Sequence, residues 1–255
     1  MFIIHKGINI FYSDEGKGTA MVLLHGFLEN VTMWDEIKEA LVKKYRIITI
    51  DLLGHGQTGC LGYVHTMEMM AEAVEVVLHH LKIRKSIFVG HSMGGYVALA
   101  YAEKNPDAVK TLVLLNSTAR ADSDEKQKNR DRTIAIVKKD HKSFVRMSIS
   151  NLFRPKNRKI FSKKIKLVKH EALKTPVQGI IAALEGMKIR NDREVLLHFS
   201  PYKKVFMMGK KDPVLDYKSL IDQVQNSDIQ VVEFSDGHMS HIENKDAVIG
   251  VLKKM

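Results

Sequence analysis

Short apolar runs of strand length alternate with stretches of helical pattern along the first half of the chain. The runs are continuous rather than alternating in polarity, which is typical of strands buried on both faces of a parallel sheet. After a starting hairpin at 2–13, they lie at 20–24, 46–50, 86–89 and 109–115. Helical stretches lie between them at 32–43, 66–82 and 93–104, with Thr32 and Thr66 as expected N-caps. The alternation predicts an α/β fold with a mostly parallel central sheet flanked by helices.

The strand pattern disappears between residues 119 and 198, where lysine-rich segments take over. Apolar residues in this region recur at helical spacing, for example at Phe161, Ile165, Val168 and Ala172. Strand patterns return at 204–208 and 229–234, and a last helical stretch begins near 245. The order predicts a core built from 1–118 and 199–255, with an all-helical cap inserted at 119–198.

The composition favours a single core in a reducing compartment. With 255 residues, 45% of them hydrophobic, the chain can bury one substantial core. Cys60 is the only cysteine, so no disulfide can form within the chain, and a cytoplasmic setting is expected. The first residues lack the pattern of a secretory signal, and no segment reaches the roughly 20 apolar residues that cross a bilayer. We therefore expect an untargeted protein without a transmembrane segment.

The formal net charge of +11 is concentrated in one segment. Residues 119–198 contain 21 Lys and Arg against 9 Asp and Glu, whereas the rest of the chain contains 19 against 20. These lysines either form solvated helix faces or attract an anionic substrate or surface. Nucleic acid is not an expected partner, because the segment has neither interleaved aromatic residues nor a known binding motif.

The sequence Gly90-His91-Ser92-Met93-Gly94-Gly95 carries the strongest chemical signal. It lies between an expected strand and an expected helix, which is the context that a nucleophile elbow of the G-x-S-x-G type requires. Glycines on both sides tolerate a sharp turn, so Ser92 can project from the edge of the sheet. The following helix directs its N-terminal amides and positive dipole end to the same place. The motif predicts a serine nucleophile.

With this motif the chain resembles the α/β-hydrolase superfamily, from about residue 8 to the end, although the insert matches only loosely. His25-Gly26-Phe27 follows the strand at 20–24, where members of the family place an oxyanion-hole residue. The segment from Asp51 to Gly56 is similar to the family's D-x-x-G-x-G turn. The resemblance implies that the backbone N–H groups of Phe27 and Met93 form the oxyanion hole, where fixed amides stabilise a tetrahedral oxyanion.

In this fold the catalytic residues follow in the chain order serine, acid, histidine. His238 lies in the loop after the last expected strand and is the expected base, whereas His241 is a rival located where the final helical region begins. Asp212 follows the strand at 204–208, where the family usually keeps its acid, and Pro213 favours an extended Asp212. Asp236 is too close to His238 in sequence to be its expected partner.

The resemblance implies hydrolysis of a small-molecule carboxylic ester through an acyl-enzyme intermediate. C–C bond hydrolases, lactonases, perhydrolases and a lyase of menaquinone synthesis share the scaffold, and a non-catalytic small-molecule receptor is the alternative of another class. Serine at the elbow argues against haloalkane dehalogenases and epoxide hydrolases, which carry aspartate there. The histidine spacings suggest no metal site, and no G-x-G-x-x-G follows the first parallel strand, so no cofactor is expected.

Overall fold

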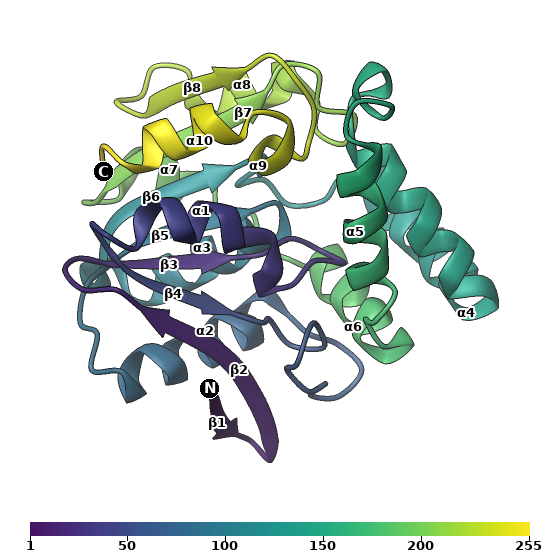
Figure 1. The fold of residues 1–255 in the computed structure, drawn as a ribbon, viewed down its shortest axis with the longest axis horizontal. Helices are drawn as coiled ribbons and strands as arrows, with labels where there is room; N and C mark the ends of the chain where they lie inside the picture. Colours follow the sequence, from purple (N-terminus) through teal and green to yellow (C-terminus); the bar gives the residue numbers. More distant parts are fainter.

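The structure is a computed structural model that describes residues 1–255. Eight strands form one sheet in the order β1-β2-β4-β3-β5-β6-β7-β8 (Figure 1). The strands are β1 (Phe2–His5), β2 (Ile8–Glu15), β3 (Ala20–Leu24), β4 (Arg46–Ile50), β5 (Ser86–His91), β6 (Val109–Leu115), β7 (Lys203–Gly209) and β8 (Gln230–Phe234). The helices are α1 (Asp35–Leu41), α2 (Met67–His80), α3 (Met93–Lys104), α4 (Asp124–Leu152), α5 (Ser162–Ala172), α6 (Val177–Lys188), α7 (Val195–Phe199), α8 (Tyr217–Val224), α9 (Ser240–Glu243) and α10 (Lys245–Leu252).

The expected mostly parallel sheet is confirmed. Only β1 and β2 run antiparallel to their neighbours, and β3 to β8 all run parallel. Leu24 at the end of β3 pairs with Gly90 of β5, and Gly90 in turn pairs with Leu114 of β6. The carboxyl ends of these central strands therefore meet at one edge, which is where open α/β sheets bind their ligands.

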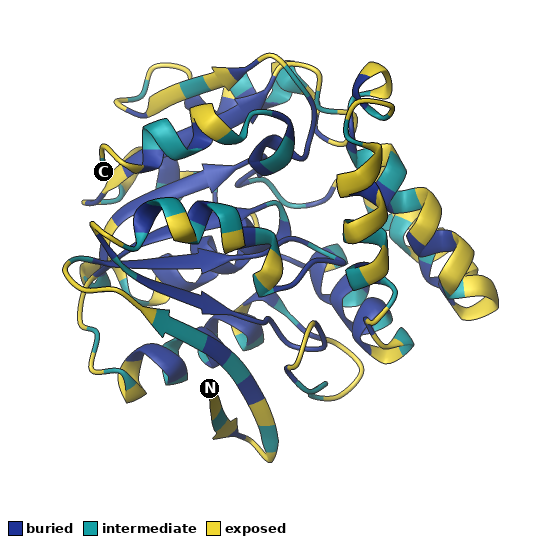
Figure 2. Cartoon of the chain, viewed as in Figure 1, coloured by how far each residue is buried: buried dark blue, intermediate teal, exposed yellow.

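The sheet separates two apolar layers, because successive side chains of a strand point to opposite faces. In β3, Val22 and Leu24 belong to the larger core with α2 and α3, whereas Met21 and Leu23 belong to the smaller core with α1 and α10. Figure 2 shows the central strands largely buried, and every residue of β3 and β5 is buried. Burial on both faces explains why their sequences are continuously apolar.

The start of the first helical stretch was wrongly predicted. Thr66 is the N-cap of α2, but Thr32 lies inside a 3₁₀ turn at Val31–Trp34 that precedes α1. Asn30 is the cap of that turn, and its Oδ1 accepts the Thr32 N–H at 3.0 Å. Asparagine and threonine are both good capping residues, so the sequence alone does not show which of Asn30 and Thr32 is the cap. The path of the loop decides it.

Residues 119–198 form α4 to α7 and no strand. Figure 1 shows α4, α5 and α6 beyond the arrowheads of β3, β4 and β6. Helix α4 is kinked at Asp140, whose φ of −152° and ψ of 81° are not helical. No helix of the chain combines the length and the apolar composition that a bilayer crossing requires.

Helix α6 contacts the loop between β4 and α2 through glycines. A Cβ atom at Gly186 would lie 1.7 Å from the carbonyl oxygen of His65, and one at Gly179 would lie 2.1 Å from the Gly54 oxygen. The His65 N–H donates to the Ala182 oxygen at 2.9 Å, which fixes the helix at this short separation. Only glycine permits backbones to approach so closely.

We expect Gly186→Ala to lower the free energy of unfolding by about 1–3 kcal/mol, because the methyl group must displace backbone rather than a flexible side chain. Thermal unfolding followed by circular dichroism measures this loss. Gly250→Ala is the matched control, since a Cβ at this position in α10 meets no atom within 4 Å. The control is expected to be neutral or slightly stabilising. Equal melting temperatures for Gly186→Ala and the wild type would contradict the close contact.

Candidate active site

Ser92 lies on a tight turn between β5 and α3. Its φ of 49° and ψ of −116° are unusual for a residue other than glycine. A Cβ at Gly90 would lie 2.4 Å from the Gly94 oxygen, and one at Gly94 would lie 2.2 Å from the Leu24 oxygen. The glycines thus allow the turn to pack against β3, and the strained backbone raises the Ser92 side chain at the edge of the sheet.

The structure brings Ser92, His238 and Asp212 together. His238 Nε2 lies 2.9 Å from Ser92 Oγ, and His238 Nδ1 lies 2.7 Å from Asp212 Oδ2. The side chains of His238 and Asp212 are 2% and 0% exposed. Because an ionised carboxylate only accepts hydrogen bonds, Nδ1 carries the proton and Nε2 faces the serine hydroxyl.

Backbone and side-chain donors hold the Asp212 carboxylate in the loop after β7. Its Oδ1 accepts the N–H groups of Val214 and Leu215 at 2.8 and 3.0 Å, and its Oδ2 accepts Asn116 Nδ2 at 3.1 Å. Burial would raise the pKa of Asp212, but His238 and the two amides outweigh burial and lower the pKa below its usual range. The group therefore stays ionised beside the imidazole.

We expect Asp212→Asn to lower kcat by about 10⁴-fold, because an amide in this position favours the wrong imidazole tautomer. Steady-state kinetics on a hydrolysed ester measures the loss. Asp236→Asn is the matched control, since Asp236 pairs with Arg154 and Asn157 at 2.9 Å and not with His238. A fully active Asp212→Asn protein would mean that another group orients His238.

The two expected oxyanion donors belong to segments that follow neighbouring strands, β3 and β5, at the same edge of the sheet. Phe27 belongs to the loop after β3, and Met93 is the first residue of α3. Neither backbone N–H donates a hydrogen bond among those formed in the turns, loops and helix ends of the chain. Both are therefore available to a substrate, and their role as an oxyanion hole stays a prediction.

His25 and His91, which flank the expected catalytic turns, make structural hydrogen bonds. His25 Nε2 accepts the Leu52 N–H at 2.9 Å, which ties the loop after β3 to the loop after β4. His91 Nε2 lies 3.0 Å from the carbonyl oxygen of His238. These contacts agree with the packing roles of both residues, and neither ring forms a hydrogen bond to Ser92.

Sequence reasoning missed Glu29, a buried carboxylate that connects these loops. Its Oε2 accepts the Gly26 N–H at 2.9 Å and lies 2.7 Å from His91 Nδ1. Burial would raise the pKa of Glu29, but His91 outweighs burial and lowers the pKa to about 2. The only signal in the sequence is that a charged residue follows the segment His25 to Leu28 in the loop after β3. This signal is too weak to assign a contact to Glu29.

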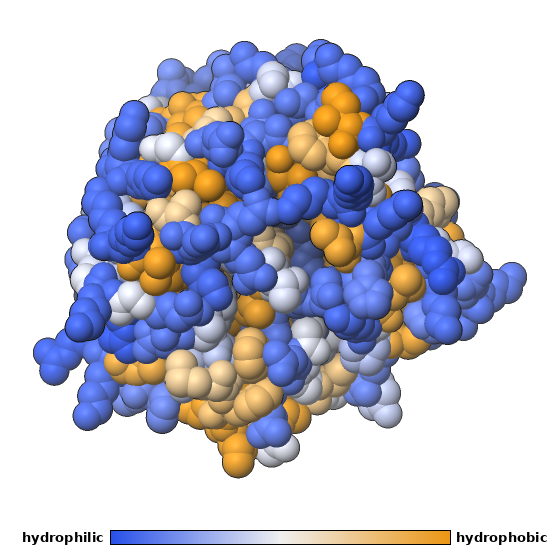
Figure 3. Space-filling model, viewed as in Figure 1, coloured by the Kyte–Doolittle hydropathy of each residue, from blue (hydrophilic) through white to orange (hydrophobic).

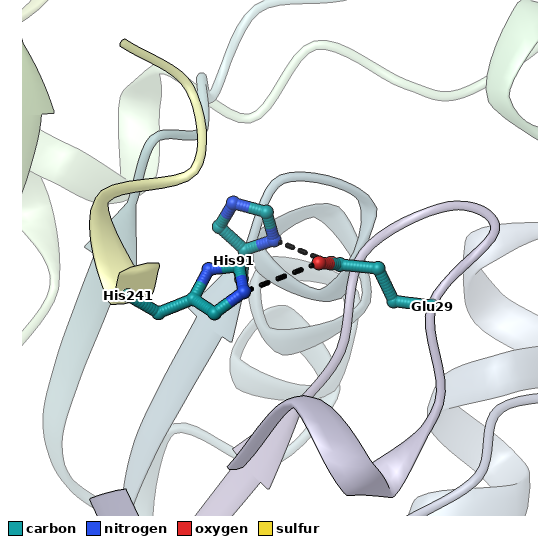
Figure 4. Close-up of side chains that lie close together, drawn as sticks. All are labelled: Glu29, His91 and His241. Atoms are coloured by element: carbon teal, nitrogen blue, oxygen red, sulfur yellow. Dashed lines mark hydrogen bonds and ion pairs between the residues drawn. The ribbon is translucent and has the colours of Figure 1, made fainter. Parts of the chain in front are cut away.

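His241, the rival for the catalytic base, lies on α9 and makes no hydrogen bond to Ser92. It is 4% exposed, and its ring packs edge-on against His91, with centroids 5.0 Å apart. Burial lowers the pKa of His241 to about 3, so the ring is neutral. Its Nε2 faces Glu29 Oε1 at 3.5 Å (Figure 4).

The comparisons with known proteins agree with this architecture. A family model described as alpha/beta hydrolase fold matches residues 19–245. A putative non-heme haloperoxidase of Mycobacterium phage D29 is 33% identical over 118 residues, 46% of this chain and 42% of that protein. A pimeloyl-(acyl-carrier protein) methyl ester esterase of Aliivibrio salmonicida is 34% identical over 112 residues, 44% of this chain and 41% of that protein. The chain thus spans less than half the length of these curated relatives.

A solved structure matches over nearly the whole chain. A thermophilic esterase from Thermogutta terrifontis, described with malate bound, superposes with a TM-score of 0.92. It is 29% identical, and the match covers 99% of this chain and 95% of that one.

Proposed function

We propose that this chain, which belongs to the alpha/beta hydrolase fold family, is a serine hydrolase that cleaves a small-molecule carboxylic ester. The observation that carries this proposal is the continuous hydrogen-bonded chain from Ser92 Oγ through His238 to Asp212, with spacings of 2.9 and 2.7 Å. A nucleophile, a base and an orienting carboxylate at these distances are what acyl transfer requires.

In the proposed reaction, Ser92 Oγ attacks the ester carbonyl carbon while its proton passes to His238 Nε2. The N–H groups of Phe27 and Met93 hold the oxyanion, and loss of one such donor costs about 10²- to 10³-fold in kcat. The C–O bond to the alcohol then breaks, and the alcohol leaves with the proton. Water loses a proton to His238 as it attacks the acyl-enzyme, and Ser92 is regenerated with the acid as product.

Two relatives support an ester as the substrate. The Aliivibrio salmonicida protein is named as a methyl ester esterase, and the Thermogutta terrifontis protein is described as an esterase. The lactonase, perhydrolase, C–C hydrolase and lyase reactions use the same three residues, so they are distinguished by substrate and not by the triad. A receptor function is disfavoured, because Ser92, His238 and Asp212 are all present and connected.

The substrate of this proposal is an ester with a remote negative charge. Exposed lysines of residues 119–198 that form no ion pair, such as Lys138, Lys142 and Lys166, are free to attract an anion. The ligand of the Thermogutta terrifontis esterase structure, malate, is a dicarboxylate and therefore also an anion. Attraction of this kind acts on association and is screened by salt over about 8–10 Å.

We expect the purified chain to hydrolyse p-nitrophenyl esters of graded acyl length faster than a lactone or a C–C hydrolase substrate. We further expect kcat/KM for an ester with a remote carboxylate to fall more steeply than that of its neutral isostere as salt rises from about 0.01 to 0.5 M. Ser92→Ala is the control for non-enzymatic turnover. Cleavage of the C–C or lactone substrate alone would contradict the ester assignment, and equal salt responses would contradict the anionic substrate.

A further inference from the structure

Glu29, His91 and His241 form a buried cluster next to the proposed triad. They come from the loop after β3, the end of β5 and helix α9, and they are 5%, 1% and 4% exposed. One ligand-capable atom of each lies within 4.8 Å of the other two. Figure 4 shows the Glu29 carboxylate facing both imidazole rings. The residues are far apart in sequence, so histidine spacing alone could not reveal this arrangement.

We propose that this cluster binds a divalent transition-metal ion, with zinc as the best match. The ligands are the Glu29 carboxylate, His91 Nδ1 and His241 Nε2. Two imidazoles and one carboxylate are a recurrent protein ligand set for Zn²⁺, whereas Ca²⁺ and Mg²⁺ prefer a shell made mainly of oxygen. The site differs from the proposed triad in all three of its residues.

The hydrogen bonding of the cluster is incomplete without a cation. Both ring nitrogens of His241 and Glu29 Oε1 are buried and have no hydrogen-bond partner in the chain. The 3.5 Å between His241 Nε2 and Glu29 Oε1 is too long for a good hydrogen bond. A neutral imidazole has one donor and one acceptor nitrogen, so both are left unpaired in the buried His241 ring. Unpaired buried polar atoms are costly, and a cation bound to Nε2 and to Glu29 Oε1 would satisfy both of these atoms.

The spacing of the ligand atoms suits a tetrahedral ion. Zn²⁺ bonds of about 2.0–2.2 Å place neighbouring ligand atoms about 3.3–3.6 Å apart in a tetrahedron. Here Glu29 Oε1 lies 3.5 Å from His241 Nε2, whereas the other carboxylate oxygen, Oε2, lies 2.7 Å from His91 Nδ1. A proton shared between His91 Nδ1 and Glu29 Oε2 holds this shorter pair together. A bound ion would replace the proton, and the two side chains would then move apart by a small distance.

Outer contacts already orient two of the three ligands. His91 Nε2 donates to the carbonyl oxygen of His238 at 3.0 Å, which directs Nδ1 toward the cluster. The Gly26 N–H donates to Glu29 Oε2 at 2.9 Å and fixes the carboxylate. A ligating histidine commonly donates its second ring N–H to a backbone carbonyl in this way.

A cleft gives the ion a route from solvent. It has a volume of about 780 Å³ and lies between α1 and α10 on one side and α5 on the other, on the face drawn in Figure 3. Glu29 and His241 line its inner wall, and Asn30 and Asn244 lie beside them. The cleft also has room for a water molecule as the fourth ligand. Ser92, His238 and Asp212 do not line it.

The test is titration of the chelator-treated chain with Zn²⁺ by isothermal titration calorimetry. We expect one ion per chain at micromolar or lower zinc, and a higher melting temperature with zinc present. His241→Gln is expected to weaken binding by more than about 100-fold, because even loss of an outer-shell partner costs about 10- to 100-fold. His55→Gln is the matched control and should bind as the wild type does, since His55 is equally buried and also has an unpartnered Nε2.

Two further measurements keep the result specific to this cluster. Co²⁺ added to the wild-type chain should give the intense visible absorption bands of a four-coordinate site. Because this measurement uses the wild-type chain, it does not depend on the folding of a variant. His238→Gln should bind zinc normally, which separates the cluster from the triad and leaves the result independent of catalysis. Failure of the wild type to bind, a six-coordinate Co²⁺ spectrum, or equal binding by His241→Gln would each overturn the proposal.

Discussion

Replacing Ser92 with alanine is expected to lower kcat for the best ester substrate by about 10⁶-fold, the loss seen when the nucleophile of such a unit is removed. The reason is chemical, because no other hydroxyl is hydrogen-bonded to His238 Nε2. KM should change little, since alanine only removes the hydroxyl oxygen of Ser92 and leaves the neighbouring residues in place. The measurement is steady-state kinetics, checked by single turnover at high enzyme concentration.

Ser86→Ala is the matched control for this experiment. Ser86 lies on the same strand, β5, at the opposite end from the elbow, and it is 1% exposed. Its replacement should leave kcat near the wild-type value. If Ser92→Ala keeps wild-type activity, the hydrolysis depends on another nucleophile.

His238→Ala is expected to lower kcat about as much as Ser92→Ala, because the two residues act as one unit. His241→Ala should have a much smaller effect. The two histidines are close in sequence, but His238 Nε2 lies 2.9 Å from Ser92 Oγ, whereas His241 Nε2 faces Glu29 Oε1 at 3.5 Å and forms no hydrogen bond to Ser92. Circular dichroism spectra of both variants control for folding.

The ranking of these two histidine variants is the decisive outcome. A larger loss of kcat for His241→Ala than for His238→Ala would contradict the assignment of the base. The same two proteins also separate the two proposals, because zinc binding should be lost in the His241 variant and kept when His238 is changed.

Most of the sheet could be predicted because its strands are buried on both faces. The runs at 20–24, 46–50 and 109–115 coincide with β3, β4 and β6. Solvent-exposed β8 and the long β2 were less well bounded, since their partly exposed residues do not form a continuous apolar run. Their pairing is decided by tertiary contacts.

The positions of Ser92, Asp212 and His238 could be predicted because each follows a strand at the same edge of the sheet. The sequence order of strands and the glycine pattern at the elbow are local features. The Glu29, His91 and His241 cluster could not be predicted in this way. Its members follow no shared spacing, and their contact depends on how the loop after β3, the end of β5 and helix α9 come together at the edge of the sheet.

Labelling with a fluorophosphonate probe, followed by peptide mass spectrometry, tests most directly whether Ser92 is the activated nucleophile. A serine whose proton is taken by a hydrogen-bonded histidine reacts far faster than an isolated hydroxyl. We predict one adduct per chain, on the peptide that contains Ser92, and loss of labelling in both Ser92→Ala and His238→Ala. An adduct on another residue, or undiminished labelling of the Ser92→Ala protein, would contradict the proposed mechanism.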